Sequence, residues 1–242
     1  MRPGTLAAVV FGLAGLAASG AHAGELLVVS DSAAFGYARG SVLADGASVA
    51  IPAGERLALI DANGRGLTLR GPYDGALHSP PSEAPQSAAV LAALKAILDP
   101  SAHVSVGAAR KAGEAPAPPD PRYVDVSDDA TVCVAGDGSA QLWRPTPTRH
   151  TVLFVTRLAT GERAEVDWPA DQPTVPWPAR LPVVNGETYQ FALQGALTRP
   201  RITLKLLRPG ETSVAAAKRL ADAGCRGQAV AMLQQIAAAD VR

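Results

Sequence analysis

The stretch that decides the fold of the second half of the chain is LPVVNGETYQFAL, residues 181–193. An Asn-Gly pair at residues 185–186 provides a tight turn, and the residues after it alternate in character. Tyr189, Phe191 and Leu193 therefore share one face of an extended segment. Such alternation is typical of a strand that covers a hydrophobic core on one side. The stretch predicts one strand of an antiparallel sheet, entered through a turn.

Further strands are expected on both sides of this stretch. The alternation recurs at residues 130–134, 140–144, 151–158, 162–168 and 201–207, and a Gly-Asp-Gly turn separates the first two. Several short strands at regular spacing, with turn residues between them, favour a β-sandwich. We therefore expect residues 123–210 to form a β-sandwich and the chain to belong to the mainly β fold class.

The turn before Tyr189 resembles the tyrosine corner of fibronectin type III and immunoglobulin-like sandwiches. In that motif an Asn-Gly or Pro-Gly turn precedes a Tyr whose hydroxyl bonds the backbone upstream. The resemblance implies an immunoglobulin-like topology and assigns that hydroxyl contact to Tyr189. Any other antiparallel sheet with a buried Tyr is the alternative.

The first part of the chain predicts a second, smaller antiparallel β module. Turn residues separate short apolar segments, and the Asp45-Gly46 pair fits a hairpin turn between the second and third of them. We expect Tyr73 to cap the core of this module. The segments are residues 26–29, 41–43, 48–51, 56–60 and 66–70.

Residues 40–75, GSVLADGASVAIPAGERLALIDANGRGLTLRGPYDG, resemble the FecR-type β module. That module repeats a glycine, a turn, "v-l-p-a-G", an alternating strand and "l-x-G-P". It occurs in periplasmic regions of signalling proteins and in other envelope proteins, so the resemblance implies an envelope location linked to periplasmic signalling. The chain lacks the cytoplasmic anti-sigma segment and the membrane helix of a FecR regulator, so signal transfer across the membrane by this chain alone is not expected.

A helix and a linker are expected between the two β parts. Apolar residues recur at helical spacing from Ser87 to Leu98, and Asp99-Pro100 ends the pattern. Within residues 107–122, the run GEAPAPPDP holds four prolines in nine residues, which predicts an extended linker. Residues 24–106 are therefore assigned to the FecR-like module plus its helix.

Residues 211–242 predict a helical hairpin at the end of the chain. Thr212 or Ser213 is expected to cap a first helix, Gly224 ends that helix, and residues 228–238 form a second one. The spacing of Ala, Leu, Gly and Gln resembles a tetratricopeptide-like hairpin, which cannot bury its own hydrophobic face alone. We expect the pair to pack on the sandwich. Recruitment of another protein by a free pair is the alternative.

The N-terminus has the pattern of a secretory signal peptide. Arg2 precedes an uncharged apolar run of about 12–15 residues, and Ala21 and Ala23 are small residues at the positions before a cleavage point. We expect residues 1–23 to be removed and the mature chain, beginning at Gly24, to be periplasmic or secreted. An uncleaved membrane anchor is the alternative, although the run is short for a bilayer span. No later stretch is long and apolar enough to span a membrane.

Cys133 and Cys225 are the only two cysteines. In an oxidising compartment such a pair predicts a disulfide. It would close a loop of about 90 residues, which contributes about 4 kcal/mol by chain entropy. Two free thiols are the alternative. A metal site is not expected, because no further Cys or His stands near either residue.

The charge of the chain excludes a surface built for nucleic acid. Removal of Arg2 from the 22 basic residues leaves 21, against 22 acidic residues. A balanced surface gives no electrostatic attraction to polyanions, so we expect neither a nucleic-acid partner nor binding to an anionic membrane. The expected partner is therefore a protein or a cell-wall component of the envelope.

No catalytic motif stands out, so no enzyme, cofactor or metal is expected. The chain has no nucleophile elbow, zinc-protease motif or phosphate-binding loop. The mature histidines are His78, His103 and His150, and none has a close partner in sequence. A cell-wall or glycan hydrolase whose site assembles from distant residues is the alternative to a non-catalytic binding module.

Two further groups of residues are candidates for binding. Asp125, Asp128 and Asp129 are expected to lie in a solvated loop, and a Ca²⁺ site of oxygen ligands is the alternative. Three tryptophans lie in or beside predicted strands and could stack on sugars if exposed, whereas buried tryptophans would belong to the core. They are Trp143, Trp168 and Trp177.

Overall fold

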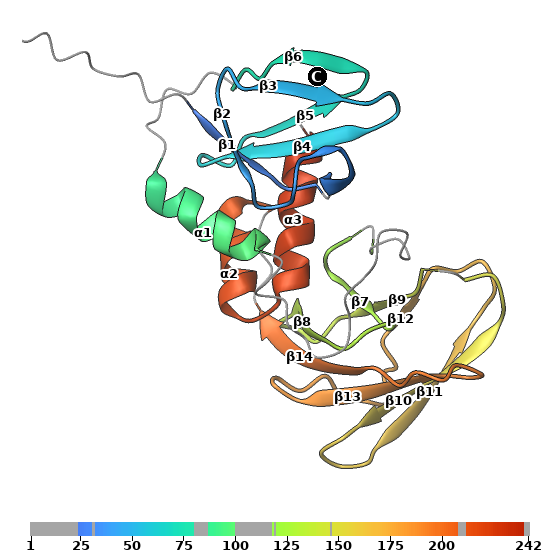
Figure 1. The fold of residues 1–242 in the computed structure, drawn as a ribbon. Coiled ribbons are helices and arrows are strands. Elements are labelled where there is room, and N and C mark those ends of the chain that lie inside the picture. The colour runs from blue at the N-terminus through green and yellow to red at the C-terminus, as the bar shows by residue number, and fades with distance from the viewer. Residues whose placement is uncertain are drawn as a thin grey trace, which may run out of the picture.

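The computed structural model describes residues 24–30, 32–79, 87–99, 118, 120–145, 147–207 and 212–239. These residues are mainly β, with 14 strands and three α-helices, which confirms the predicted fold class. The strands form two lobes, and the helices lie between them (Figure 1). The predicted signal peptide, residues 1–23, and most of the predicted linker at 107–122 lie outside the described residues.

The first lobe is a four-stranded sheet packed against a two-stranded ribbon. The sheet has the order β2-β1-β4-β5, and the ribbon is formed by β3 and β6. Their facing side chains form one core, with Leu26 and Leu57 from the sheet and Val49 and Ile51 from the ribbon. The strands are β1 (Glu25–Val28), β2 (Val42–Ala44), β3 (Ser48–Ile51), β4 (Arg56–Asp61), β5 (Gly66–Arg70) and β6 (Tyr73–Ala76), with a short 3-10 helix at Ala33–Phe35.

The Asp45-Gly46 turn does not close the predicted hairpin. β2 pairs with β1, whereas β3 pairs with β6, so the turn carries the chain from one layer to the other. Gly46 has φ +81°, which suits a tight turn of either kind, so the turn residues do not reveal which strands pair. β6 was not predicted. Tyr73, at its start, packs partly buried against the core of this lobe.

The second lobe is a β-sandwich of five and three strands. The larger sheet has the order β11-β10-β13-β14-β8 and the smaller sheet the order β12-β9-β7. Two pairs are parallel, β14 with β8 and β7 with β9, and the other pairs are antiparallel. The strands are β7 (Tyr123–Asp125), β8 (Ala130–Ala135), β9 (Gln141–Trp143), β10 (Thr151–Arg157), β11 (Arg163–Trp168), β12 (Thr174–Pro176), β13 (Thr188–Leu193) and β14 (Arg201–Leu207).

Tyr189 joins β13 to the segment that precedes it. Its side chain is fully buried in the sandwich core. The hydroxyl donates to the Pro182 carbonyl at 2.7 Å and accepts from the Val184 N–H at 3.0 Å. These are the upstream backbone contacts expected of this tyrosine.

The three helices begin and end at the residues that cap them. They are α1 (Ala88–Leu98), α2 (Val214–Asp222) and α3 (Arg226–Ala239). Ser87 accepts a hydrogen bond from the Val90 N–H and caps α1, and Ser213 caps α2 through the Ala216 N–H. Gly224, with φ +86°, ends α2 in the left-handed conformation that favours glycine.

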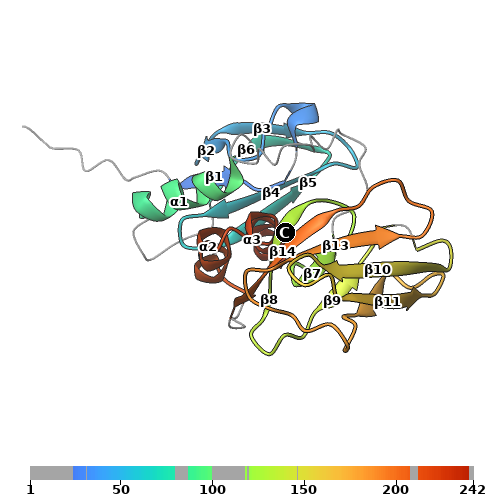
Figure 2. The ribbon, with the colours of Figure 1, turned by 90° about the horizontal axis from the view of Figure 1, so that it is seen from below.

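The helical pair packs mainly on the first lobe, which corrects the expectation that it packs on the sandwich. α2 and α3 share one core with α1 and with Leu27, Val29 and Ile60, on the outer face of the four-stranded sheet. α3 lies in the centre of the molecule, between the two lobes (Figure 2). Its buried residues occur on several sides of the helix, so one sheet alone could not cover them. A free helical pair is therefore not available to recruit a partner.

α3 approaches β5 so closely that only glycine fits at one position. A Cβ on Gly66 would lie 2.5 Å from the Ala237 Cα. Beside it, the Thr68 hydroxyl donates to the Ala237 carbonyl at 2.8 Å. The last turns of α3 are thus held against β5.

The predicted disulfide is present and joins the sandwich to the helices. Cys133 lies in β8 and Cys225 lies between α2 and α3, with Cα atoms 5.8 Å apart. The side-chain amide of Gln228 supports this junction, since it accepts from the Cys133 N–H at 2.6 Å and donates to the Cys133 carbonyl at 2.8 Å. Within the part of the chain that the structure describes, no helix is long and apolar enough to cross a membrane.

Candidate functional site

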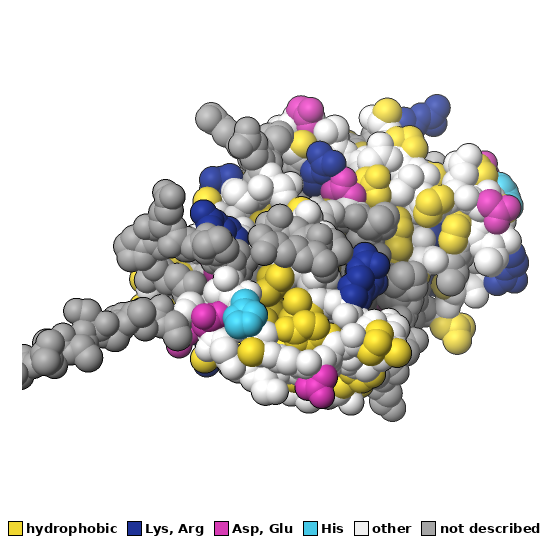
Figure 3. All heavy atoms as spheres, turned by 90° about the horizontal axis from the view of Figure 1, so that it is seen from above, with side chains coloured by type: hydrophobic (Ala, Val, Ile, Leu, Met, Phe, Trp, Pro, Cys, Tyr) yellow, Lys and Arg dark blue, Asp and Glu magenta, His cyan; other side chains and the backbone are white. Residues whose placement is uncertain are grey.

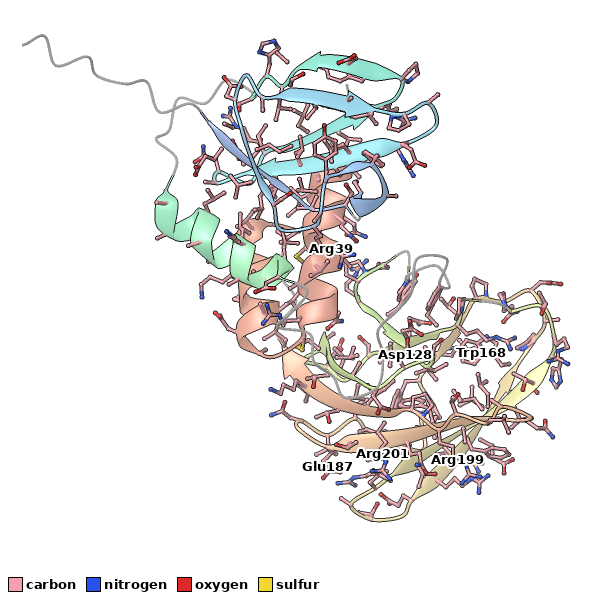
Figure 4. The ribbon with its side chains drawn as sticks, in the orientation of Figure 1. Arg39, Asp128, Trp168, Glu187, Arg199 and Arg201 are labelled. Carbon is pink, nitrogen blue, oxygen red and sulfur yellow. A yellow bond between two sulfur atoms is a disulfide. The ribbon has the colours of Figure 1, made fainter. Side chains whose placement is uncertain are left out.

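The three tryptophans do not form an exposed binding row. Trp143 and Trp168 are buried in the sandwich core, and Figure 4 labels Trp168 in this lobe. Trp177 is half-buried, with its ring centroid 5.1 Å from that of Tyr189. The indole N–H groups of Trp168 and Trp177 donate to backbone carbonyls. Burial and these bonds place the tryptophans in the structural core. The interpretation that Trp143 and Trp168 stack on sugars from an exposed surface is therefore wrong.

Four connecting segments meet at one end of the sandwich. The register of the strands brings together the ends of β7 and β9 and the starts of β8, β10, β12 and β14. We call this region the loop end. It comprises the described residues of 126–129, 144–150, 169–173 and 194–200, from which residue 146 is excluded.

Arg144 fixes two of these segments to each other. Its side chain is buried, and its guanidinium lies 4.9 Å from the Trp168 ring centroid. One terminal nitrogen donates to the carbonyls of Arg149, at 2.8 Å, and Pro169, at 3.1 Å. Burial lowers the pKa of Arg144. A buried cation that bonds two carbonyls holds the loop end in a defined shape.

The surface of the loop end combines one fully exposed apolar side chain with charges of both signs. Leu197 has a relative exposure of 102%, the largest among the exposed large hydrophobic residues. Arg199 and Arg201 follow it, and the Asp129 carboxylate accepts from the Arg201 N–H at 2.7 Å. Figure 3 views the molecule from the side of the first lobe, where hydrophobic side chains lie in small groups among polar and charged ones.

The acidic residues near this end do not form a metal site. Asp125 accepts from the Ser127 N–H at 2.9 Å, and Asp129 is bound to the backbone of Arg201. Among the residues that the structure describes, no group of three or more His, Cys, Asp or Glu side chains could hold a metal ion. The carboxylates of Asp125 and Asp129 thus stabilise the backbone of the segments that they join.

One histidine of the loop end has a carboxylate partner. The His150 Nε2 lies 2.6 Å from an Asp167 carboxylate oxygen, and both side chains are well exposed. A catalytic histidine needs its partner to fix the ring while a nucleophile faces the other nitrogen. This pair lies on the open surface, and His103 lies outside the described residues.

The opposite end of the sandwich holds an ion-pair network. The Arg157 guanidinium donates to both carboxylate oxygens of Glu187, one of them at 2.7 Å, and to Glu162 at 3.2 Å. The hydrogen bonds to Arg157 lower the pKa of Glu187, and those to Glu187 raise the pKa of Arg157. The network ties the turn between β10 and β11 to the start of β13, which is a structural task.

A cavity lies where the sandwich meets the helices. Its volume is about 560 Å³, and its apolar lining includes Val134, Leu207, Leu220 and Met232. Asp120 and Arg122 at its margin pair with each other, at 2.5 Å between the closest atoms. That pairing lowers the pKa of Asp120. The cavity lies beside the disulfide and marks the junction between the lobes.

No protein-family model, curated protein or solved structure matches this chain. The candidate site therefore rests on the chain's own geometry. Sequence reasoning selected the tryptophans and missed Leu197 and Arg144. Leu197 could have been recognised from the sequence as an exposed residue, because it is a single leucine within the turn-rich run QGALTRP between two alternating strands.

Proposed function

We propose that this chain is an exported, non-catalytic binding protein of the cell envelope, and that the loop end holds a protein or cell-wall partner. The observation that carries this proposal is the complete exposure of Leu197 at the tip of the β13–β14 connection. Binding residues concentrate on loops that a rigid scaffold positions. Arg144 and the flanking strands supply that scaffold here.

Two observations support export. The first 23 residues have the order of features found in signal peptides. The chain's only two cysteines form a disulfide, a bond that persists in oxidising compartments such as the periplasm and the extracellular space. Both features agree with a periplasmic or secreted protein.

The resemblance of residues 40–75 to FecR-type modules supports a partner in periplasmic signalling. The helices and the disulfide tie this first lobe to the sandwich. A partner bound at the loop end would therefore be held at a set position relative to the first lobe. This arrangement suits a protein that brings two envelope components together.

Site-specific photo-cross-linking tests the proposed binding surface. A photoreactive amino acid is placed at Leu197 and, as the control, at Val42, an exposed apolar residue of the first lobe. In native envelopes we expect position 197 to cross-link to one reproducible protein or wall fragment that position 42 does not capture. Equal products from both positions, or none from position 197, would contradict the loop end as the binding surface.

Incubation with envelope polymers tests the non-catalytic part of the proposal. Purified chain is added to peptidoglycan and to envelope glycans, and soluble products are measured by mass spectrometry. We expect the polymers to remain intact, with or without co-sedimentation of the chain. Release of fragments would instead support the glycan-active hydrolase.

A further inference from the structure

In the part of the chain that the structure describes, one edge of the larger sandwich sheet is covered by other parts of the chain, and the other edge is not. At the β8 edge, the Gln228 amide bonds both the N–H and the carbonyl of Cys133, and the disulfide holds the helices beside it. At the β11 edge, β10 is the only strand that pairs with β11 among the described residues. An uncovered strand edge is a template for pairing with another strand.

The register with β10 identifies the backbone groups that β11 leaves open. The Arg157 N–H donates to the Glu162 carbonyl at 2.9 Å. In an antiparallel ladder, every second residue along a strand bonds the same neighbour. The even-numbered residues of β11 therefore bond β10, and Arg163, Glu165 and Asp167 turn their N–H and carbonyl groups outward.

The side chains of these three residues are charged and exposed. They lie on the outer face of the sheet, because Ala164 and Trp168 face the core. The Arg163 guanidinium stacks over the Phe154 ring at 3.9 Å from its centroid, which holds it on that face. Charges on an edge discourage unrelated strands, but they favour a strand whose charges are complementary.

We propose that β11 pairs antiparallel with β11 of a second copy of this chain, about a two-fold axis at Ala164. In this register Arg163 of each copy lies directly opposite Glu165 of the other. Pairing of the open backbone groups requires odd-numbered residues to face odd-numbered ones. A register centred on Glu165 also sets Arg163 opposite Asp167, but it places the two Glu165 carboxylates directly against each other. A register centred on Val166 sets Glu165 against Asp167. The register at Ala164 is the one of these three that has opposite-charge pairs and no like-charge pair, so charge favours it.

The pairing joins two sandwich sheets into one continuous sheet. A two-fold axis makes the interface self-complementary, so a single set of residues builds both halves. β11 runs from the end of the sandwich that holds Arg157 toward the loop end. Antiparallel pairing therefore points the two loop ends in opposite directions, which leaves both free to bind partners.

Sedimentation velocity on residues 24–242 over a concentration series tests the pairing. The wild-type chain is expected to form a dimer. Glu165→Arg places two arginines opposite each other at both symmetric positions, and we expect it to raise the dimer dissociation constant on the order of tenfold or more. Arg180→Glu, an exposed charge reversal outside β11, is the control and keeps the wild-type constant.

The double variant R163E/E165R makes the test specific. It exchanges the two charges, so opposite charges again face each other across the axis, and we expect it to recover most of the affinity lost in R163E and E165R. Near-UV circular dichroism verifies that each variant is folded. A wild-type chain that stays monomeric, a dimer that E165R leaves unchanged, or a double variant without recovery would each overturn the proposal. The Leu197 cross-link is measured separately, so its result does not depend on this dimer.

Discussion

The contribution of a tyrosine hydroxyl to the stability of this fold depends on whether its hydrogen bonds are buried or exposed. Tyr189 is fully buried, and its hydroxyl satisfies one carbonyl and one N–H beside β13. Burial raises the pKa of Tyr189, in keeping with a hydroxyl that stays neutral. Tyr73 also donates to a carbonyl, that of Ala76 at 2.7 Å, but on the exposed side of its lobe. Water can replace the exposed Tyr73 contact more readily than the part-buried contacts of Tyr189.

Tyr189→Phe is expected to lower the free energy of unfolding by about 1–3 kcal/mol, because it leaves the part-buried Pro182 carbonyl and Val184 N–H without the hydroxyl that bonds both. Tyr73→Phe, the matched control, is expected to cost about 0.5 kcal/mol or less, because water solvates the freed carbonyl. Urea denaturation followed by tryptophan fluorescence and far-UV circular dichroism measures both. Equal losses in the two variants would contradict the role given to Tyr189.

Among the secondary-structure elements, α3 is placed by its contact with β5, and two glycines test that placement. At Gly66 an added Cβ would meet backbone atoms of Ala237 and Ile236, whereas at Gly227, within α3, it would meet nothing within 4 Å. We expect Gly66→Ala to destabilise the fold by about 1–3 kcal/mol through overpacking. Gly227→Ala is expected to be neutral or to stabilise by up to about 1 kcal/mol. Thermal unfolding compares them, and a neutral Gly66→Ala would place α3 elsewhere.

The elements whose signals are local could be predicted from the sequence. β14 runs over Arg201–Leu207 as expected, because its alternation is complete. α1 begins directly after Ser87 and ends before Asp99, as the helical spacing and the Asp99-Pro100 pair predicted. The pairing of β3 with β6 and the position of α3 could not be predicted, because each depends on residues far away in the chain. Local patterns fix where a strand or helix lies in the sequence and leave its neighbours open.

The candidate site was predictable to a smaller degree for the same reason. A tryptophan in an alternating strand has the same sequence pattern whether its face is covered or open, so Trp168 could be assigned to a surface or to the core. Only the second sheet decides, and it buries Trp168. The disulfide was predictable because only one pairing of two cysteines exists. The Gln228 contact with β8 had no sequence signal, since its partners are backbone atoms.

At the scale of the whole molecule, the C-terminal helices pack against the N-terminal lobe. After the sandwich, α2 and α3 fold back onto the sheet of the first lobe and cover Leu27, Val29 and Ile60. The first lobe thus has two cores, one between its sheet and ribbon and one beneath the helices. The sandwich has a core of its own, which contains Trp143 and Trp168. The two lobes therefore differ in their dependence on the C-terminal helices.

A chain that ends at residue 211, carrying Cys133→Ala to avoid a free thiol, tests this difference. Loss of α2 and α3 exposes Leu27, Val29 and Ile60. Each such side chain contributes about 1.5–3 kcal/mol when buried, so the loss is comparable to a small domain's stability of about 5–15 kcal/mol.

We expect the backbone amides of β1, β4 and β5 to lose their protection from hydrogen exchange in this truncated chain. Tryptophan emission is expected to stay blue-shifted, because all three tryptophans lie in the sandwich. The full-length chain with both cysteines replaced by Ala is the control. Retained protection in β4 would show that the first lobe folds without the helices.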